Sequence, residues 1–507
     1  MKENNKKKLR NNVYTIIFFV LIFFLISSII LNKPLTDLDE MWNYNFSKNI
    51  LEGRLPYKDF NIIQMPLVPY IGTIFLMIFG NQLLSMRILA IIISFLIIYF
   101  SYLILKEFKV NKYVNLLSIV GIVYLFEQHF RVDYNFFLLL ILLVIIYIEL
   151  KNKEYLGKIS YKDIVIGILL GICICTKQTT GICIAFVSIF YQLIFVKDKE
   201  SFKIFIKKSM YRIIGIMLPI LVLVIYFTLF DLWIDFIDYS ILGIKTFSNK
   251  ISYFNLLKSD NLIIKIFSII IPLFMLIQLI SILTKKVKLI NINISNLTLF
   301  AYSCASIVVV YPISDEIHFL VGTLPVILLI IIKTYQLLNK IITNKAVTIF
   351  LKSFTQIIIV WIGICILYYS LINMYNYFNN CNKYEQINHF YYIPDSDYSR
   401  VKDVNEYINS QNKGVYILDA QAVFYTIPLD QYNKNYDMLL KGNLGAKGEE
   451  KIINEIKTSD NIQLLLLNDR QKLNWQTPTN IINYTKENLT NIGSVGIFDI
   501  YENRGNK

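Results

Sequence analysis

The chain has 507 residues, of which 55% are hydrophobic and 17% are charged, and its net charge is +14. A charged fraction this far below the roughly 25% of soluble domains excludes an ordinary soluble enzyme, and the composition also excludes collagen, coiled coil and disordered chain. Apolar runs at 13–32, 83–105 and 347–372 are long enough to cross a bilayer, because about 20 helical residues span its ~30 Å hydrocarbon core. The sequence therefore predicts a polytopic membrane protein.

The positive charge does not indicate a nucleic-acid partner. From residue 373 onward there are 14 Lys and Arg against 16 Asp and Glu, so the excess of basic residues lies earlier, in the loops that flank apolar runs. The six cysteines lack the paired spacing of a disulfide framework or a zinc site. We therefore expect membrane lipids as the surroundings, with no nucleic-acid partner.

Apolar runs and basic loops together predict a path through the membrane. Lys and Arg of short loops stay preferentially in the cytoplasm, and the path that follows places 25 of them inside and 11 outside, with the N-terminus inside. An odd number of crossings then places the C-terminus outside the cytoplasmic membrane. Eleven spans are expected: 13–32, 83–105, 113–128, 134–150, 163–177, 181–196, 212–230, 262–283, 296–313, 318–334 and 347–372.

The first outer loop, residues 33–82, is unusually long. Its segment 66–79 is apolar but too short for a span, which is typical of an interfacial helix. Loops of this length are usually functional. Within the bundle, Gly167 and Gly171 are expected to form a close-packing face between helices.

Beyond residue 373 the pattern is that of a water-soluble domain. Helices are expected at 400–411, 447–457 and 478–489, and strands at 415–418, 462–467 and 495–501, which indicates a small α/β unit with a partly parallel sheet. The glycines near residue 445 do not follow a strand, so they do not make a dinucleotide-binding loop. The fold class expected is an α-helical polytopic membrane domain (1–372, with about 11 transmembrane helices) followed by a soluble extracytoplasmic α/β domain (373–507).

Ionisable residues gather at the outer ends of the predicted spans. Charge at membrane depth is costly and usually serves a role. Each group has a structural alternative: Asp39 and Glu40 could cap a helix that begins near Met41, Arg131 and Asp133 could simply pair, Lys177 could extend to the lipid headgroups, and His318 could be a satisfied core residue. The groups are Asp37, Asp39 and Glu40; Arg131 and Asp133; Lys177 and Gln178; and Asp315, Glu316 and His318.

The run DEMWNYNFSKNILEGRLPYKDFNIIQMPLVPYIGTIFLMIFG, followed by SMRIL and FRVDYN, resembles the dolichyl- or undecaprenyl-phosphate sugar transferases of the GT-C superfamily, in particular the protein O-mannosyltransferase and aminoarabinose-transferase branch. One departure is Gln64-Met65-Pro66, where the family usually has two prolines after a basic residue or His. The matching positions are Asp39-Glu40, Trp42, Tyr44, Gly53, Pro66-Leu67, Asp133, Thr176-Lys177 and His318.

The resemblance implies a GT-C-like fold and an inverting membrane glycosyltransferase. Such an enzyme moves a sugar from a polyprenyl-phosphate carrier to a hydroxyl of a glycan, lipid or protein on the outer face of the cytoplasmic membrane. The residues suit this chemistry, because a phosphate leaving group needs cations rather than a proton donor, whereas the attacking hydroxyl needs a base. Asp39 is the expected base, with Glu40 and Asp133 orienting the acceptor. Lys177, Arg131, His318, Arg87 and Lys58 are expected at the donor phosphate, and Trp42, Tyr44, Tyr57 and Gln178 at the sugar or acceptor.

The sequence also permits three other interpretations. Asp37-Leu38-Asp39 has the spacing of a DxD metal motif, but the branch resembled generally works without a metal, so no cofactor is expected and a divalent ion is not favoured. The alternative function is a transporter or lipid flippase with a charged outer vestibule. Transporters commonly show internal repeats with broken helices, and this sequence has none that we detect. A non-catalytic scaffold is disfavoured by the acidic first loop.

Overall fold

The computed structural model describes residues 2–503 except 36, 153–159, 247–249, 288–292, 384–394, 420–421, 427–442, 460–461 and 468–477. Contacts divide the chain into two compact units. The first unit consists of Met1–Asn32, Ala90–Val222 and Lys250–Tyr377, and the second of Lys33–Leu89, Leu223–Asn249 and Phe378–Lys507.

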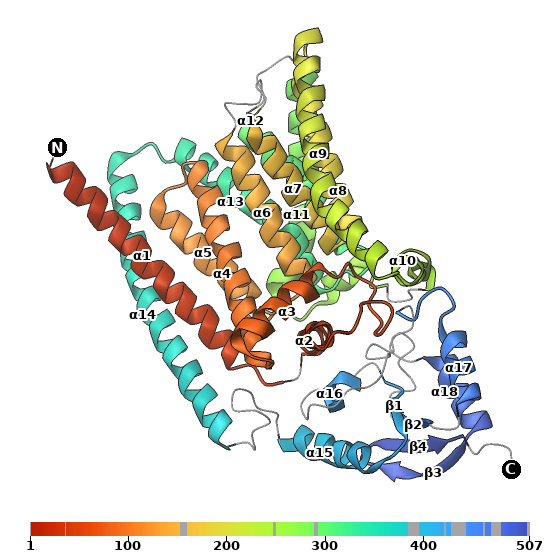
Figure 1. Ribbon diagram of the computed structural model, residues 1–507. Helices are drawn as coiled ribbons and strands as arrows, with labels where there is room; N and C mark the ends of the chain where they lie inside the picture. Colours follow the sequence, from red (N-terminus) through yellow and green to blue (C-terminus); the bar gives the residue numbers. More distant parts are fainter. Residues whose placement is uncertain are drawn as a thin grey trace. The chain divides into compact units, whose positions relative to one another are not determined.

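The first unit is entirely helical in its described residues (Figure 1). All eleven segments expected as spans are helices, and eight helices are long and apolar enough to cross a membrane. Three others, α5, α7 and α12, are shorter, and 3₁₀ turns extend α8 and α12. The bounds are α1 (Lys2–Leu31), α4 (Leu83–Glu107), α5 (Lys112–Phe126), α6 (Tyr134–Lys151), α7 (Tyr161–Thr176), α8 (Gln178–Phe190), η2 (Tyr191–Phe195), α9 (Lys199–Leu229), η5 (Tyr253–Lys258), α11 (Leu262–Val287), α12 (Ile294–Ser306), η6 (Ile307–Val310), α13 (Glu316–Ile341) and α14 (Lys345–Lys383).

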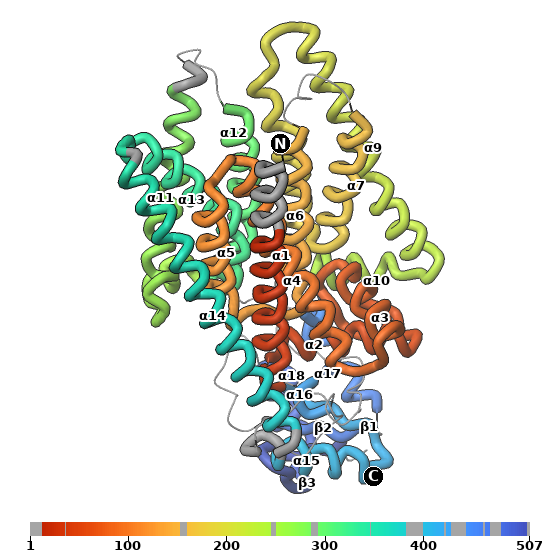
Figure 2. Tube along the Cα trace, turned by 90° about the vertical axis from the view of Figure 1, so that its left-hand side faces the viewer, coloured from red at the N-terminus to blue at the C-terminus, as the bar shows by residue number. Residues whose placement is uncertain are grey.

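The core of this unit lies where α6, α7, α8, α12 and α13 pack side by side (Figures 1 and 2). Its side chains are aliphatic and buried, among them Leu143, Leu170, Ile184, Leu299 and Leu328. By contrast, α9, α11 and α14 carry many exposed apolar side chains. In the apolar stretch of α11, only 11% of the residues are buried. Because water would penalise such surfaces, these helices are suited to contact lipid.

Glycines bring α7 and α9 unusually close. A Cβ added at Gly167 would lie 2.3 Å from the carbonyl oxygen of Arg212, and one at Gly171 would lie 2.7 Å from that of Ile216. No side chain other than hydrogen fits at such distances. The expected close-packing role of Gly167 and Gly171 is thus confirmed.

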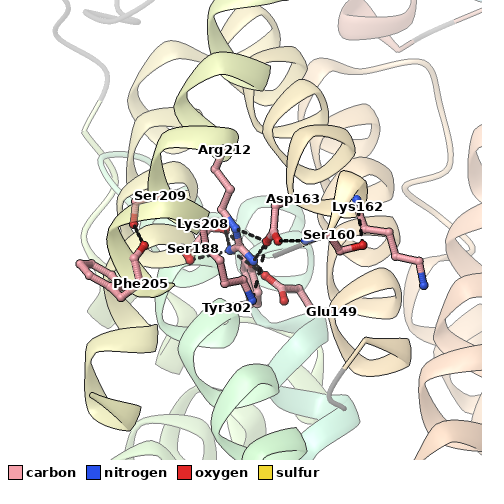
Figure 3. Close-up of polar contacts among 10 residues, drawn as sticks. All are labelled: Glu149, Ser160, Lys162, Asp163, Ser188, Phe205, Lys208, Ser209, Arg212 and Tyr302. Atoms are coloured by element: carbon pink, nitrogen blue, oxygen red, sulfur yellow. Dashed lines mark hydrogen bonds and ion pairs between the residues drawn. The ribbon is translucent and has the colours of Figure 1, made fainter. Parts of the chain in front are cut away.

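A buried ionic network is the main polar feature of this packing, and Figure 3 shows how its side chains converge. Arg212 of α9 is 1% exposed, and its guanidinium lies 2.8 Å from Glu149 Oε1 and 3.2 Å from Asp163 Oδ1. It also donates to the carbonyl oxygen of Ser188 at 2.7 Å, and the Tyr302 hydroxyl lies 3.0 Å from Glu149 Oε1. The guanidinium therefore joins α9 to α6, α7 and α8, and the Tyr302 hydroxyl adds α12 to the network.

The second unit contains the first outer loop and the C-terminal domain. Its helices outside the C-terminal domain are α2 (Leu38–Leu51), α3 (Leu67–Phe79) and α10 (Trp233–Ile237), followed by a π-helical turn η3 (Asp238–Leu242) and a 3₁₀ turn η4 (Gly243–Thr246). The short helix expected at 66–79 is confirmed as α3. It packs on α2, where Thr73 Oγ1 donates to the carbonyl oxygen of Ser47 at 2.9 Å.

The C-terminal domain is a four-stranded mixed sheet with helices. The strand order is β1-β2-β4-β3, with β1 (Gly414–Ile417) parallel to β2 (Ile462–Leu467) and antiparallel pairing elsewhere. The partly parallel sheet is confirmed, but the single strand expected at 495–501 is wrong: Gly496 has a φ of +53°, and the chain turns there between β3 (Thr490–Val495) and β4 (Phe498–Glu502). The three expected helices are confirmed, and a short fourth is present: α15 (Asp395–Ser410), α16 (Ala422–Thr426), α17 (Glu449–Thr458) and α18 (Thr479–Asn488).

The C-terminal domain packs against residues 33–82 and against the segment that follows α9 within this unit. Helix α16 contacts α2, and Asn61 Nδ2 donates to the carbonyl oxygen of Asn443 at 3.2 Å. The backbone N–H of Ala446 donates to Asp238 Oδ1 at 2.9 Å. A Cβ at Gly445 would lie 2.3 Å from Asp238 Oδ2, so only glycine fits beside this carboxylate.

Removal of the Arg212 charge should destabilise the fold. Arg212→Met leaves Glu149 buried without its cation, while Asp163 keeps Lys208 at 3.8 Å. Removal of one partner of a buried ion pair typically costs about 3 to 5 kcal/mol. We expect a clearly lower unfolding temperature of the detergent-purified protein. Lys207→Met on the same helix, where the lysine is exposed, is the matched control and should leave the transition in place. Equal unfolding temperatures for the two variants would contradict a stabilising role of the network.

Candidate active site

The residues expected at the site form two groups, one in each unit. In the second unit, the acidic group lies at the start of α2. Asp37 is the N-cap, and its carboxylate accepts the backbone N–H groups of Asp39 and Glu40 at 3.1 and 3.4 Å. Asp37 therefore caps α2, whereas the sequence suggested Asp39 and Glu40 for this role. Asp39 is half-buried in the first turn.

Glu40 and Arg87 form a buried bidentate ion pair. Arg87 Nε donates to Oε1 at 2.9 Å and Nη2 to Oε2 at 3.1 Å, and the two side chains are 6% and 0% exposed. This geometry is the strongest that a carboxylate and a guanidinium make. The pair ties α2 to the start of α4 and so fixes the helix that carries Asp39.

The aromatic residues of the first loop differ in their surroundings. Tyr57 is 2% exposed, has a positive φ of 69°, and donates its hydroxyl to the carbonyl oxygen of Gln64 at 2.7 Å. Its ring packs edge-on against Phe227 and Phe236, so Tyr57 belongs to the core of the loop. Trp42 is 8% exposed, and its Nε1 has no hydrogen-bond partner in the described part of the chain. The Tyr44 hydroxyl donates to the carbonyl oxygen of Asn81 at 3.4 Å. The side chain of Lys58, in the same loop, is exposed.

In the first unit, the polar group lies where α6, α8 and α13 begin. Asp133 is the N-cap of α6 and accepts the backbone N–H of Asn135, and it is 3% exposed. Arg131 Nε lies 3.9 Å from Asp133 Oδ2. The pairing weighed from the sequence is thus present, and it is combined with a helix cap.

Lys177 occupies the break between α7 and α8. Its backbone is extended, with φ −146° and ψ 101°, so neither helix continues through it. Its ammonium donates to Asn135 Oδ1 at 2.9 Å and lies 5.1 Å from the centre of the Tyr134 ring. The side chain therefore turns toward α6 and its neutral amide, rather than pairing with a carboxylate. Gln178 follows it as the first residue of α8 and is half-buried.

His318 lies in the first turn of α13, opposite Asn135. Asp315, the N-cap of α13, accepts the backbone N–H of His318 at 2.8 Å, and its Oδ1 lies 2.7 Å from His318 Nδ1. Burial acts to raise the pKa of Asp315, but the hydrogen bonds from His318 and the nearby charges of His318 and Arg131 outweigh it and hold that pKa below its usual value. Asp315 is therefore an ionised acceptor for the imidazole.

Two members of this group were not assigned from the sequence. Asn135 is 1% exposed and lies between Lys177 Nζ and His318 Nε2, which are 2.9 and 3.5 Å from its amide atoms. Asp315 had been noted only as one acid of a polar turn. The sole sequence signal for Asn135 was its position two residues after Asp133. Among the described residues, no group of three or more His, Cys, Asp or Glu side chains could hold a metal ion.

The sequence was compared with protein families and with curated proteins. Residues 64–227 match the family described as dolichyl-phosphate-mannose-protein mannosyltransferase. This match covers α3 to α9 and includes Arg87, Asp133 and Lys177. No curated protein matches the chain.

Solved structures resemble nearly the whole chain. ArnT from Cupriavidus metallidurans bound to undecaprenyl phosphate has a TM-score of 0.55 at 12% identity, covering 97% of this chain and 98% of ArnT. Its apo state gives 0.52 at 11% identity, with 99% and 98% covered. The archaeal oligosaccharyltransferase AglB from Archaeoglobus fulgidus, in complex with an inhibitory peptide and a dolichol-phosphate, gives 0.51 at 12% identity, with 96% and 74% covered.

At such low identity, the similarity to solved structures shows the fold alone. The family match rests on the amino-acid sequence of residues 64–227. The expected GT-C-like architecture is thereby confirmed, with a multi-pass helical membrane part and a small C-terminal mixed sheet. The chain is thus similar to the dolichyl-phosphate-mannose-protein mannosyltransferase family over residues 64–227, about a third of its length, and similar in fold to ArnT over nearly its whole length.

Proposed function

We propose that this protein transfers a sugar from a polyprenyl-phosphate carrier to a hydroxyl of a glycan, lipid or protein, with inversion at the anomeric carbon. The observation that carries the proposal is the environment of Lys177. Its ammonium has a neutral amide and an aromatic ring as partners, so its charge is not consumed by a bonded carboxylate. Two structures of similar fold, ArnT with undecaprenyl phosphate and AglB with a dolichol-phosphate, support an isoprenoid phosphate as the ligand.

The chemistry of the transfer matches the two groups of residues. The bond between the anomeric carbon and the phosphate oxygen breaks, and its electron pair stays on the phosphate. Fixed cations stabilise this growing charge, and such stabilisation is often the largest catalytic contribution. We assign this role to Lys177, with Arg131, His318 and Lys58 as further phosphate contacts. Asp133 binds Arg131 and caps α6, which suits an orienting role.

Asp39 is the proposed base for the attacking hydroxyl. It is half-buried in the first turn of α2, and the capping of that helix is performed by Asp37. Trp42, Tyr44 and Gln178 are proposed contacts of sugar or acceptor. For Tyr57, whose hydroxyl is bonded within the loop core, we propose a role in shaping the loop.

The membrane placement remains part of the proposal: the N-terminus is cytoplasmic, and the first loop and the C-terminal domain are extracytoplasmic. The packing of α16 on α2 supports a common side for these two regions. A C-terminal domain on the outer face would then lie where a glycan, lipid or exported protein can be reached.

The base assignment is tested with Asp39→Asn. Loss of general-base help should lower the transfer rate by about 10² to 10⁴, measured with radiolabelled polyprenyl-phosphate hexose and a panel of hydroxyl acceptors. Asp37→Asn is the matched control, because asparagine also caps helices well and its rate should stay near that of the parent. Equal turnover by Asp39→Asn and the parent would remove Asp39 from this role.

The role of Arg87 is tested by a double-mutant cycle with Glu40. The sequence predicted a phosphate contact, whereas the buried pair with Glu40 favours a positioning role. Glu40→Met and Arg87→Met should each lower stability by about 3 to 5 kcal/mol, and the double variant Glu40→Met with Arg87→Met should cost less than the sum of the two. If the double variant regains stability and also regains the donor KM, Arg87 acts through α2. If stability returns while the donor KM stays high, Arg87 contacts the phosphate.

The sidedness is tested by cysteine accessibility in a variant without the native cysteines. With intact cells and a membrane-impermeant maleimide, Gln128→Cys and Lys451→Cys should be labelled, whereas Lys109→Cys and Lys207→Cys should react only after permeabilisation. All four side chains are exposed in the structure, so burial does not mask them. The opposite pattern would invert the proposed topology.

A further inference from the structure

Asn135 lies between two groups that the proposed function uses at the donor phosphate. Lys177 Nζ is 2.9 Å from its Oδ1, and His318 Nε2 is 3.5 Å from its Nδ2. Asn135 itself is 1% exposed, so water does not replace these contacts. A buried amide with different partners at its two ends transmits a change at one end to the other.

The hydrogen-bond pattern assigns each proton in this chain. An ammonium only donates, so the amide oxygen of Asn135 must face Lys177 and its NH₂ must face His318. The Nε2 atom of His318 is then an acceptor and carries no proton. The ring proton is therefore on Nδ1, where it is donated to Asp315 Oδ1 at 2.7 Å. The ionised state of Asp315 is consistent with this direction.

A phosphate bound at Lys177 would change this assignment. Where the bound phosphate draws all three N–H groups of the ammonium away from Asn135, the buried Oδ1 of Asn135 loses its donor, and an unsatisfied buried acceptor costs about 1 to 3 kcal/mol. Rotation of the amide by half a turn lets Oδ1 accept a hydrogen bond from a proton on His318 Nε2. Since Nδ1 already carries its proton for Asp315, His318 would then be an imidazolium.

We propose that Asn135 is a positioning residue that couples phosphate binding at Lys177 to protonation of His318 at Nε2. The proposal rests on the proposed function, because it takes the polyprenyl phosphate as the ligand of Lys177. It goes beyond that function by giving the site a second cation that forms only when the phosphate is present.

The added cation matches the charge change of the reaction. A sugar phosphodiester carries one negative charge, whereas the leaving phosphomonoester carries about 1.5 to 2 at neutral pH. The proton of the attacking hydroxyl goes to the base and then to water. The proton on His318 Nε2 comes from water when the donor binds and returns to water when the carrier leaves. This coupling of Lys177 to His318 through Asn135, called the relay below, therefore leaves the overall proton balance of the transfer unchanged.

Other charged or titratable groups lie near His318 on the elements that pack around it, and their electrostatic effect is present with and without a bound phosphate. Asp315 and Arg131 interact with one another, Asp133 binds Arg131, and Glu316 contacts Ser259. The groups are Asp315 and Glu316 at the start of α13, Arg131 and Asp133 before α6, Lys177 before α8, and Tyr253 of η5, which packs on the neighbouring Phe319.

The test reads the ring state of His318 directly. The chain has three histidines, so solid-state NMR of protein with ¹⁵N-labelled histidine in liposomes gives few signals, and the signal lost in His318→Gln is that of His318. At mildly alkaline pH we expect a proton on Nδ1 alone in the parent, and protons on both nitrogens after saturation with undecaprenyl phosphate. An unchanged ring state in the phosphate-bound parent would overturn the relay.

Two variants separate the relay from a merely structural asparagine. Asn135→Leu removes both ends of the link, so His318 should stay neutral with and without the lipid, although Lys177 still binds phosphate. Asn135→Asp offers only acceptors, so His318 should carry both protons in either state, and the donor KM should rise about tenfold or more because a full charge now holds Lys177. Asn115→Leu, at another buried asparagine of the same unit, is the control and should respond as the parent does.

Kinetics and folding provide the remaining readouts. Asn135→Leu should lower kcat about ten- to a hundredfold, with a smaller effect on the donor KM, because the lost stabilisation belongs to the transition state. Unfolding temperatures of all variants show whether the effect is on folding. If Asn135→Leu folds but His318 still gains its second proton with lipid bound, the relay does not pass through Asn135.

Lipid binding is measured separately, with radiolabelled undecaprenyl phosphate and with Lys177→Met as the variant that should not bind. If the parent fails to bind this lipid, the proposed donor is wrong. The relay is then judged with inorganic phosphate alone: a second proton on His318 supports it, and an unchanged ring overturns it. Failure of the function and failure of the relay are thus distinguishable.

Discussion

The cost of a charge without a partner in an apolar interior governs the polar architecture of this protein. Moving an ion out of water costs several kcal/mol even after relaxation, and the described residues show how this cost is met. Arg212 contacts Glu149 and Asp163, and Arg87 is bound by both oxygens of Glu40. These pairs join helices distant in sequence, so the charges that are costly to bury also specify which helices pack together.

Two cations lie near opposite ends of α6, and they differ in how their charge is paired. Asn135 lies in the first turn of this helix and Glu149 near its end, about four turns or roughly 20 Å later. At the far end, Arg212 contacts two carboxylates, the carbonyl oxygen of Ser188 and the hydroxyl of Ser188. At the near end, the ammonium of Lys177 contacts the amide of Asn135 and the ring of Tyr134. One bundle thus contains the ionic network of Arg212, in which the cation is paired with carboxylates, and the cation of Lys177, which has a neutral amide as its hydrogen-bond partner.

Local pattern predicted the helices but not their partners. Hydropathy and length suffice for a span, so all eleven segments and the short α3 were found. The strand at 495–501 was wrong because the pattern of β-formers does not reveal that Gly496 turns the chain. Asp39, Lys177 and His318 were singled out from their type and place. The pairing of Arg87 with Glu40 and the position of Asn135 depend on contacts between residues far apart in sequence, which no local pattern contains.

The neutral partner of the half-buried Lys177 is compatible with the proposed role of this lysine in binding a ligand. A carboxylate in place of Asn135 would bind the ammonium more tightly, but a phosphate would then have to displace a full charge. An amide satisfies one N–H while leaving the net charge available, and its other end reaches His318. The nearby carboxylates Asp133 and Asp315 are each occupied by a helix cap and a basic partner. The site can therefore hold a cation without neutralising it.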